Sequence, residues 1–441
     1  MKLNWKKITL MRNLNKVIAC ILCFCLVVLS GYRSSYSMTL EEKLHSLSKQ
    51  IAQAQKEENI EEIYSLVQEM QTVLGDKAGV PEQREKYISI PDSFHVFAEE
   101  YVPQAFLDHE EFIRSAWWNS CPSSGECKGA LREVSSAIIG CLHARNAGCK
   151  NPDNLLLLAK QAGDFLIYAQ DSAGAGVYPC PDLRGTGGRM DELVTAFLKK
   201  AEQKGVLDQV LHNGWIMEDF ESGDLFFDHG LCGFALLELY EETKDPLYLT
   251  SALWAAQWLN DRPSVPNWNY NSFVVLFLVR LARVTGDATF FSSAIKRVQL
   301  GIIPGQLQNG PNSGKWIDPH NARFVYHMII VRSLIEVLEA GNEFQDDVAA
   351  EEMKSIRHSF SLAMECRYKE LIDFGFNHPD ITCECFSRIR LAPDTFKDYL
   401  SDSLFQEIEE NLDRYVGETY RRGTIKLSPA ALGYYLEALV E

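Results

Sequence analysis

Four carboxylate side chains in one acidic and aromatic stretch, residues 218–230, are the first candidates for chemistry: Asp219, Glu221, Asp224 and Asp228. Enzymes that hydrolyse a glycosidic bond ordinarily use two carboxyl groups, one protonated to donate to the leaving oxygen and one ionised as base or nucleophile. Asp228 is the first choice for the acid, because Phe226 and Phe227 beside it would raise its pKa by desolvation. The stretch therefore predicts acid–base chemistry by carboxyl groups.

Asp318 is the expected partner of Asp228, acting as the base. It lies in a second polar stretch, residues 306–321, which runs directly into an apolar segment. Capping is the alternative role for both residues, because Asp228 stands at a predicted helix start and Asp318 precedes a proline. A capping carboxylate accepts backbone hydrogen bonds and has no catalytic role.

A second chemistry uses other residues in the same part of the chain. Removing the proton beside a uronate carboxylate takes a base such as His or Tyr, and an amide or Arg to neutralise the carboxylate. The sequence offers these types in Tyr270, Asn271, His320, Asn321 and Arg323. Each also has an ordinary structural role as a core residue, a helix cap or a surface ion-pair partner. A lyase or epimerase acting on a uronate-containing glycan is therefore the alternative to a hydrolase.

The predicted loops also contain residue types that bind sugars, because aromatic faces stack on sugar rings while carboxylates and amides bond the hydroxyls. The expected sugar platforms are Trp215, Trp268, Tyr270 and Trp316. Further binding candidates are Tyr178, Arg184, Asp224, His229, Asn271, Asn321 and Arg323. A non-catalytic protein that binds a glycan or serves as a scaffold is the alternative from a different class of function.

Helical hairpins must position these loops, because apolar residues recur at helical spacing along the chain and no sustained alternation indicates a strand. Leu239-Tyr-Glu-Glu-Thr-Lys-Asp245 aligns with Leu281-Ala-Arg-Val-Thr-Gly-Asp287 at an offset of 42 residues, and a second apolar helix follows each. A helical hairpin repeated at this spacing indicates a helical array or a toroid.

The phrases Leu239-Tyr-Glu-Glu-Thr-Lys-Asp-Pro-Leu-Tyr-Leu249 and Val284-Thr-Gly-Asp-Ala-Thr-Phe-Phe291 resemble those of the six-hairpin glycosidase superfamily, and the resemblance covers about residues 129–341. The resemblance implies an all-α fold, an (α/α) toroid of about six helical hairpins. It also implies a carbohydrate-active enzyme, since the superfamily includes glycoside hydrolases, polysaccharide lyases and sugar epimerases. In such a toroid the loops that precede the inner helices gather at one mouth. A glycoside hydrolase acting on a poly- or oligosaccharide is the preferred prediction.

The first 37 residues form a separate segment. Basic residues precede the apolar run 17–30, and Ser35-Tyr-Ser37 offers small residues for cleavage. The run is shorter than the ~20 residues that span a bilayer, so it predicts a signal peptide and a secreted or periplasmic protein. An uncleaved N-terminal anchor is the alternative. Residues 38–80 are expected to form a helical arm of two amphipathic helices that break near Glu58-Asn59. Residues 81–441 are expected to form the toroid domain, with a helix at about 102–118.

The net charge excludes some partners. The whole chain holds 43 basic and 60 acidic residues, and residues 1–37 contain six of the basic residues and none of the acidic ones. A domain so acidic does not bind nucleic acid, whose phosphates require Lys and Arg. The expected partner is a carbohydrate substrate, without stable membrane insertion after cleavage of the signal peptide.

The nine cysteines beyond residue 37 predict some disulfide bonds in an exported protein, and Cys121 with Cys127 or Cys141 with Cys149 would close short loops. Cys383-Glu-Cys385 has no second Cys or His pair at the spacing of a zinc site, so no metal is expected. No cofactor is expected either, since Gly185-Thr-Gly-Gly188 has neither the preceding strand nor the following Lys-Ser/Thr of a phosphate loop.

Overall fold

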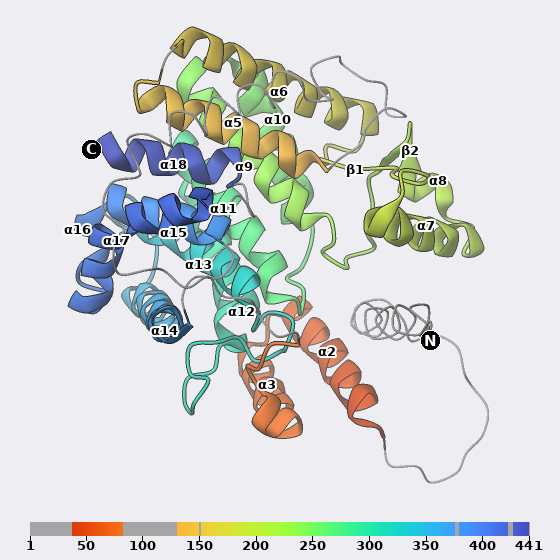
Figure 1. Cartoon of the computed structure of the whole chain (residues 1–441). Coiled ribbons are helices and arrows are strands. Elements are labelled where there is room, and N and C mark those ends of the chain that lie inside the picture. Colours follow the sequence, from red (N-terminus) through yellow and green to blue (C-terminus); the bar gives the residue numbers. More distant parts are fainter. Residues whose placement is uncertain (1–37, 83–129, 150, 375–378, 422–426, 441) are drawn as a thin grey trace, which may run out of the picture. The chain divides into compact units, whose positions relative to one another are not determined.

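The computed structural model describes residues 38–82, 130–149, 151–374, 379–421 and 427–440. These residues form an all-α protein, which confirms the predicted fold class, and their strands are three segments of two residues each (Figure 1). The predicted signal peptide, the predicted helix 102–118 and the Cys121–Cys127 loop lie outside the described residues. No helix in the described ranges is both long enough and apolar enough to cross a membrane.

The chain divides into two units, with the boundary after Gly75. In the first unit, α2 (Leu40–Lys56) packs against α3 (Ile60–Leu74). The break between them falls where the sequence predicts it, because Glu58 adopts a positive φ of 56° and Asn59 caps α3 by accepting from the Glu62 N–H. The predicted two-helix arm is therefore present.

Residues 76–82 belong to the second unit, although the sequence analysis placed the boundary after residue 80. Gly79 N–H donates to the Ile317 carbonyl oxygen at 2.8 Å, and Asn312 donates to the Ala78 carbonyl oxygen at 2.9 Å. A Cβ on Gly79 would lie 2.6 Å from a methyl carbon of Leu307. These backbone contacts join the segment to the polar loop before α13 (Phe324–Ala340).

Six helices of the second unit contact one another in cyclic order. Each helix contacts the next and the last contacts the first: α5 (Leu131–Asn146), α9 (Phe226–Thr243), α11 (Trp268–Thr285), α13, α15 (Pro379–Leu391) and α18 (Pro429–Val440). Five further helices each contact mainly one of these, in the same order: α6 (Pro152–Ala173), α10 (Pro246–Asn260), α12 (Ala288–Gly301), α14 (Ala350–Phe374) and α17 (Asp402–Arg421). We call the first six helices the inner set and the five that contact them the outer set (Figure 1).

The repeated sequence phrases close the inner helices and open the outer ones. Helix α9 ends at Lys244, whose φ is 57°, and α11 ends at Gly286, whose φ is 71°. The aspartate after each, Asp245 or Asp287, caps the next helix by accepting a backbone N–H. The residues that recur 42 positions apart thus form the same two caps each time, one that ends a helix and one that begins the next.

A small insertion lies between α6 and α9. Strands β1 (Cys180–Pro181), β3 (Trp215–Ile216) and β2 (Leu211–His212) form an antiparallel sheet in that order. Helix α7 (Gly188–Gln203) packs on it through a separate apolar cluster that includes Leu198 and Val210. The insertion carries β1 to the start of α9, where the site described below is built.

Glycine permits the closest helix contact in the inner set. A Cβ on Gly230 of α9 would lie 2.3 Å from the Phe273 carbonyl oxygen of α11. Gly230→Ala should therefore lower the free energy of unfolding by about 2 kcal/mol, since neither backbone can yield. Urea unfolding measures the change.

The matched control is Gly341→Ala, where the new Cβ meets only the terminal methyl carbon of Met353. That flexible side chain can move, so this variant should lose less than about 1 kcal/mol. Equal losses in the two variants would contradict the close-contact explanation.

Candidate functional site

The starts of neighbouring inner helices meet on one side of the second unit. Arg132 of α5 bonds Asp228 of α9, and Tyr270 of α11 bonds Asp224, just before α9. Asn269 of α11 bonds Asn321, just before α13. We call this set of polar side chains the rim.

Asp228 is held in place by Arg132. The Asp228 Oδ1 accepts from the Arg132 Nε at 2.9 Å and from its backbone N–H at 3.2 Å, while Oδ2 accepts from Nη2 at 2.7 Å. The Asp228 side chain is 2% exposed, and the Arg132 guanidinium lies 3.7 Å from the centre of the Phe227 ring. Two oxygens that both accept from a guanidinium belong to an ionised carboxylate, which contradicts the predicted role of Asp228 as the acid.

Asp224 is the carboxyl group in the same stretch that suits an acid. It accepts from the Tyr270 hydroxyl at 3.1 Å and from the Ser222 hydroxyl at 2.7 Å. Burial raises its pKa, and this effect exceeds the opposite effect of the two hydrogen bonds. Gly223, with a φ of 81°, lets the loop pass Tyr270, because a Cβ there would lie 3.2 Å from the ring. The sequence placed Asp224 among four candidate carboxyl groups and among the binding residues, but it favoured Asp228 as the acid.

The rest of the acidic loop is folded around Asp219. This carboxylate accepts from the backbone N–H groups of Glu221 and Leu225, and it pairs with Arg262 at 3.3 Å. Burial raises the pKa of Asp219 to about 6. Its acceptor positions are occupied inside the loop, so Asp219 fixes the loop that presents Asp224.

Cys180 of β1 also lies at this site. Burial and the charge of Asp228 raise the pKa of its thiol to about 12, so it remains protonated. Sequence reasoning missed both Cys180 and Arg132. The only signal for Arg132 is a charged residue at the start of an apolar helix, and no local signal places β1 beside α9.

Asp318 belongs to a separate group of hydrogen bonds on the α13 side of the rim. It accepts from the Asn321 backbone N–H at 2.8 Å and from the Asn321 side-chain amide at 3.0 Å. Burial raises its pKa. Asn321 in turn accepts from Asn269, which ties this group to α11. The bond to the Asn321 N–H belongs to a turn and does not cap a helix, because α13 begins at Phe324 with Arg323 as its N-cap residue. The ionised base predicted for Asp318 does not agree with a raised pKa.

His320 and Arg323 contact each other directly. Arg323 Nη2 lies 2.6 Å from His320 Nδ1, and the imidazole stacks on Tyr326 with ring centres 4.2 Å apart. Burial, together with the charges of Arg323 and Arg189, lowers the pKa of His320 to about 3. The imidazole is therefore neutral at pH 7 and weakly basic.

Four predicted binding aromatics are almost fully buried: Tyr178, Trp215, Trp268 and Trp316. The Trp215 and Trp316 indole N–H groups donate to Ser172 and to the Ile302 carbonyl oxygen. A ring buried on both faces cannot stack on a sugar, so these side chains are part of the core.

Three further candidates have structural partners. His229 is buried between the Tyr178 backbone N–H and the Ala255 carbonyl oxygen, and burial lowers its pKa to about 3. Asn271 bonds the backbone of Val265 and Gly301. Arg184 is an exposed residue of the insertion and pairs with Asp182 at 2.6 Å. None of the three points its polar group into the rim.

The described cysteines form no disulfide bonds with one another, and Cys149 carries a free thiol, so the suggested Cys141–Cys149 bond is not made. Cys383 and Cys385 are buried, and their thiols donate to the carbonyl oxygens of Ala431 and Met328. Within the described ranges, no group of three or more His, Cys, Asp or Glu side chains could hold a metal ion.

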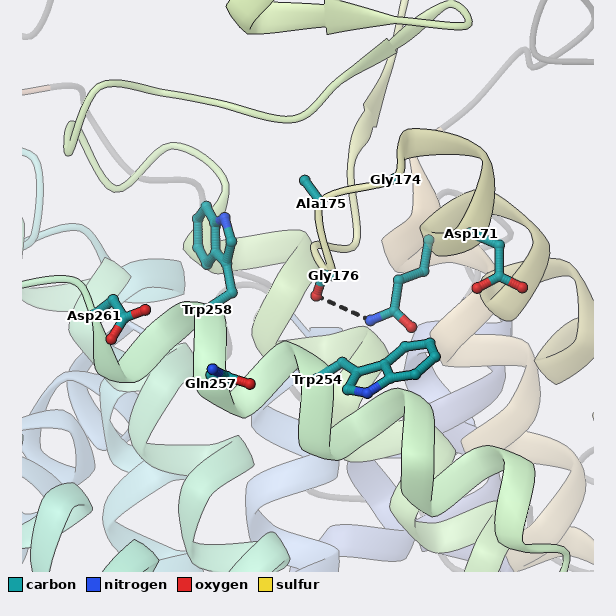
Figure 2. A pocket seen from close by; sticks show the side chains of 9 residues that line it. Asp171, Gly174, Ala175, Gly176, Trp254, Gln257, Trp258 and Asp261 are labelled. Atoms are coloured by element: carbon teal, nitrogen blue, oxygen red, sulfur yellow. Dashed lines mark hydrogen bonds between the residues drawn. The ribbon is translucent and has the colours of Figure 1, made fainter.

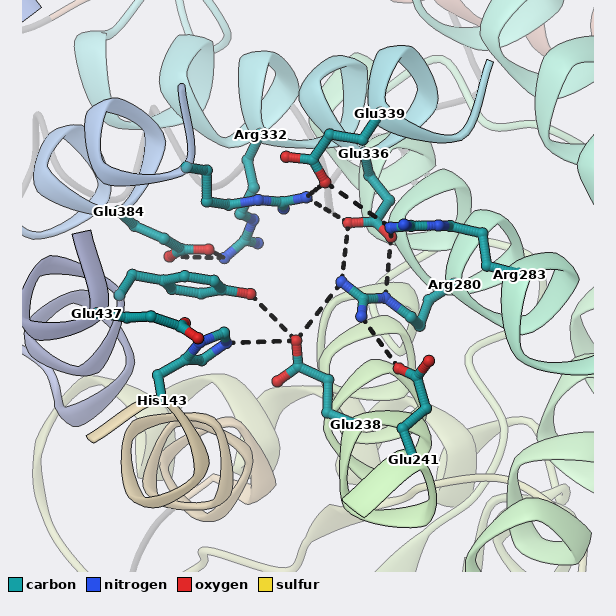
Figure 3. A network of polar contacts seen from close by, with 12 residues as sticks. His143, Glu238, Glu241, Arg280, Arg283, Arg332, Glu336, Glu339, Glu384 and Glu437 are labelled. Atoms are coloured by element: carbon teal, nitrogen blue, oxygen red, sulfur yellow. Dashed lines mark hydrogen bonds and ion pairs between the residues drawn. The ribbon is translucent and has the colours of Figure 1, made fainter. Parts of the chain in front are cut away.

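A second polar set, which the sequence analysis did not predict, lies among the later turns of the six inner helices (Figure 3). Each helix contributes at least one member: His143, Glu238, Arg280, Glu336, Arg388 and Tyr434. Glu336 is 0% exposed and pairs with Arg280 at 2.9 Å and with Arg388. We call this set the ionic core.

The charges of the ionic core perturb one another strongly. Burial alone would raise the pKa of Glu336, but Arg280, Arg388 and Arg283 lower it to about 2. Burial would likewise lower the pKa of His143, but Glu238 and Glu437 raise it to about 9. Arg280 and Glu238 occupy equivalent positions of the 42-residue repeat and lie 3.5 Å apart. Perturbed pKa values accompany structural ion networks as well as catalytic sites. Each charged member here has an oppositely charged neighbour, which supports a structural role, although one buried side-chain atom in each of His143, Glu238 and Arg388 has no hydrogen-bond partner among the described residues.

No protein-family model matches this chain, and a search of curated proteins finds no match. The rim of polar side chains at the starts of the inner helices is therefore the basis for assigning a function.

Proposed function

We propose that the protein is a carbohydrate-active enzyme that hydrolyses a glycosidic bond at the rim. One observation carries the proposal: two carboxyl groups four residues apart have opposite environments. Burial raises the pKa of Asp224, while Arg132 holds Asp228 as a carboxylate. Pairs of carboxyls with divergent environments supply the acid and the ionised partner of a glycosidase.

In this proposal Asp224 is the proton donor. Tyr270 and Ser222 orient its two oxygens, and the residue is not fully buried. Asp228 contributes a fixed negative charge near the positive charge that develops on the sugar ring. After Asp224 has given its proton to the leaving oxygen, its carboxylate takes a proton from the water that adds to the ring. The partly exposed guanidinium of Arg132 is the group that meets a sugar hydroxyl.

We also propose that the second unit is an (α/α) toroid. An (α/α) toroid places the starts of its inner helices around one mouth. The cyclic order of the six inner helices and the bonds between their first turns support that arrangement.

Hydrolysis has more support than elimination. A lyase needs a side chain that removes a proton from carbon. His320 is a poor base, because its pKa is lowered to about 3 and its Nδ1 already contacts Arg323. The Tyr270 hydroxyl donates a hydrogen bond to Asp224, so it is not placed to act as a separate base.

Asp224→Asn should reduce the turnover of a hydrolysed glycan by about 100-fold, since general acid catalysis contributes at least that factor. Release of reducing ends from a panel of polysaccharides, followed with purified protein, measures it. The control is Asp208→Asn, an exposed aspartate of α8 (Leu207–Val210), which should retain full activity. Unchanged turnover in Asp224→Asn would refute the assignment of the acid, and an unsaturated product would favour a lyase.

A further inference from the structure

A groove lies between the end of α6 and the last turns of α10, apart from the polar side chains of the rim (Figure 2). Its volume is about 480 Å³. The side chains that matter to a ligand are Asp171, Trp254, Gln257, Trp258 and Asp261, and the turn 174–176 forms one wall. A groove of this size accommodates one or two sugar residues.

Hydrogen bonds hold the walls of the groove in position. Gln170, which is 1% exposed, donates to the Gly176 carbonyl oxygen at 3.0 Å and to the Ser251 carbonyl oxygen at 3.1 Å. Its own oxygen accepts from the Ser251 hydroxyl at 2.6 Å. Gly174 and Gly176 have φ values of 75° and 68°, which glycine adopts without strain. Because Gly176 has no side chain, the turn can pass close to the backbone of α10 at Trp254. The groove is thus preformed, which lowers the entropic cost of binding.

The two tryptophans of the groove have different roles. The Trp258 ring lies between His229, with ring centres 4.7 Å apart, and the Arg262 guanidinium, 3.7 Å from its centre. Trp254, one helical turn earlier, is 53% exposed. Trp254 is therefore the side chain that offers an aromatic face to a ligand.

The polar side chains of the groove that matter to a ligand are two carboxylates, which accept hydrogen bonds, and one amide. Asp171 and Asp261 lie at opposite ends of the lining, with Gln257 between them, and all three are exposed (Figure 2). Among the residues that the structure describes, the lining contains no Lys, Arg or His, and the Arg262 guanidinium lies against the Trp258 ring. Two carboxylates without a cation repel an acidic ligand, whereas they accept hydrogen bonds from hydroxyl groups.

We propose that this groove is a second saccharide site, which binds an uncharged sugar residue on the face of Trp254 with its hydroxyls donating to Asp171 and Asp261. The inference rests on the proposed function for the class of ligand, but its residues are separate from the proposed acid and its partner. It adds the expectation that the bound glycan is neutral rather than uronate-containing.

The test is binding of the full chain to an array of neutral, amino-bearing and uronate-bearing oligosaccharides. Wild-type protein should bind neutral members. With the best neutral binder, residues 170–176 and 254–261 should gain protection from hydrogen exchange. Trp254→Ala should lose that protection and weaken binding at this site about 10-fold, because the stacking face is removed. Leu253→Ala, an exposed neighbour outside the groove, is the control.

The outcomes separate this inference from the proposed hydrolysis. Asp224→Asn should reduce turnover by about 100-fold and keep the protection of 170–176 and 254–261. If no glycan were hydrolysed while that protection still depended on Trp254, the result would support the saccharide site in the groove and contradict the proposed hydrolysis. Binding to no array member, preference for uronates or amines, or protection that is unchanged in Trp254→Ala would overturn the inference.

Discussion

Glu336→Ala should lower the free energy of unfolding by about 3–5 kcal/mol, the cost of removing one partner of a buried ion pair. Glu336 is fully buried, and its carboxylate pairs with Arg280 at 2.9 Å and with Arg388. The Arg388 side chain is only 3% exposed, so without Glu336 its charge keeps Glu339 as its remaining ion-pair partner among the described residues. Urea unfolding followed by circular dichroism measures the loss.

Glu343→Ala is the matched control for this prediction. Glu343 pairs with Arg283 at 2.9 Å, as close as the Glu336–Arg280 pair, but its side chain is 45% exposed. An exposed pair contributes at most about 1 kcal/mol, so the control variant should be nearly as stable as wild type. A loss of less than about 1 kcal/mol in Glu336→Ala would mean that the ionic core contributes little net stability, as some buried networks do.

Raising the pH from about 6.5 to about 9 should remove on the order of 3 kcal/mol of stability through His143 alone. Its pKa is about 9 in the folded protein against an ordinary 6.5, because Glu238 and Glu437 outweigh its burial. The folded state therefore binds more protons than the unfolded state between these two values, so its stability falls as the pH rises. Below pH 6.5 this contribution is fully present.

The measurement is urea unfolding at several pH values for wild type and His143→Gln. The variant lacks the titrating group, so its stability should change less between pH 6.5 and 9. His358→Asn, an exposed histidine of α14, is the control and should keep the wild-type slope. Parallel pH profiles for wild type and His143→Gln would show that His143 is not the group responsible.

The ionic core also bears on how the rim is positioned. Helix α9 carries Asp228 in its first turn and Glu238 in a later turn, and α5 carries Arg132 and His143 in the same way. The ion pairs near the helix ends therefore fix the same two helices that meet at Asp228. Loss of the ionic core should disturb the rim even though no residue is shared.

Much of the fold was predictable because its signals are local. Apolar spacing located the inner and outer helices, and the Thr-Lys-Asp and Thr-Gly-Asp phrases predicted the turns that Lys244 and Gly286 make with positive φ. The break at Glu58-Asn59 was equally predictable, since Asn is a common N-cap residue. These features depend on residues within one or two helical turns of each other.

The candidate site was predictable only in part. Sequence identified the acidic loop and the Asp318–Arg323 segment, and the structure places both at the starts of inner helices. It assigned Asp228 the role that suits Asp224, because the ionised state of Asp228 depends on Arg132, 96 residues away. It also mistook buried tryptophans for platforms, since residue type does not reveal whether a ring faces solvent.

The sequence by itself determined the helices, their caps and the repeat, because backbone geometry and apolar periodicity are local properties. Tertiary structure alone decided which charges meet: Arg132 with Asp228, Tyr270 with Asp224, and Arg280 with Glu238 and Glu336. A carboxyl group becomes an acid or a fixed carboxylate through its burial and its nearest partner. Those partners come from other helices, so the chemistry of the rim appears only when the helices are packed.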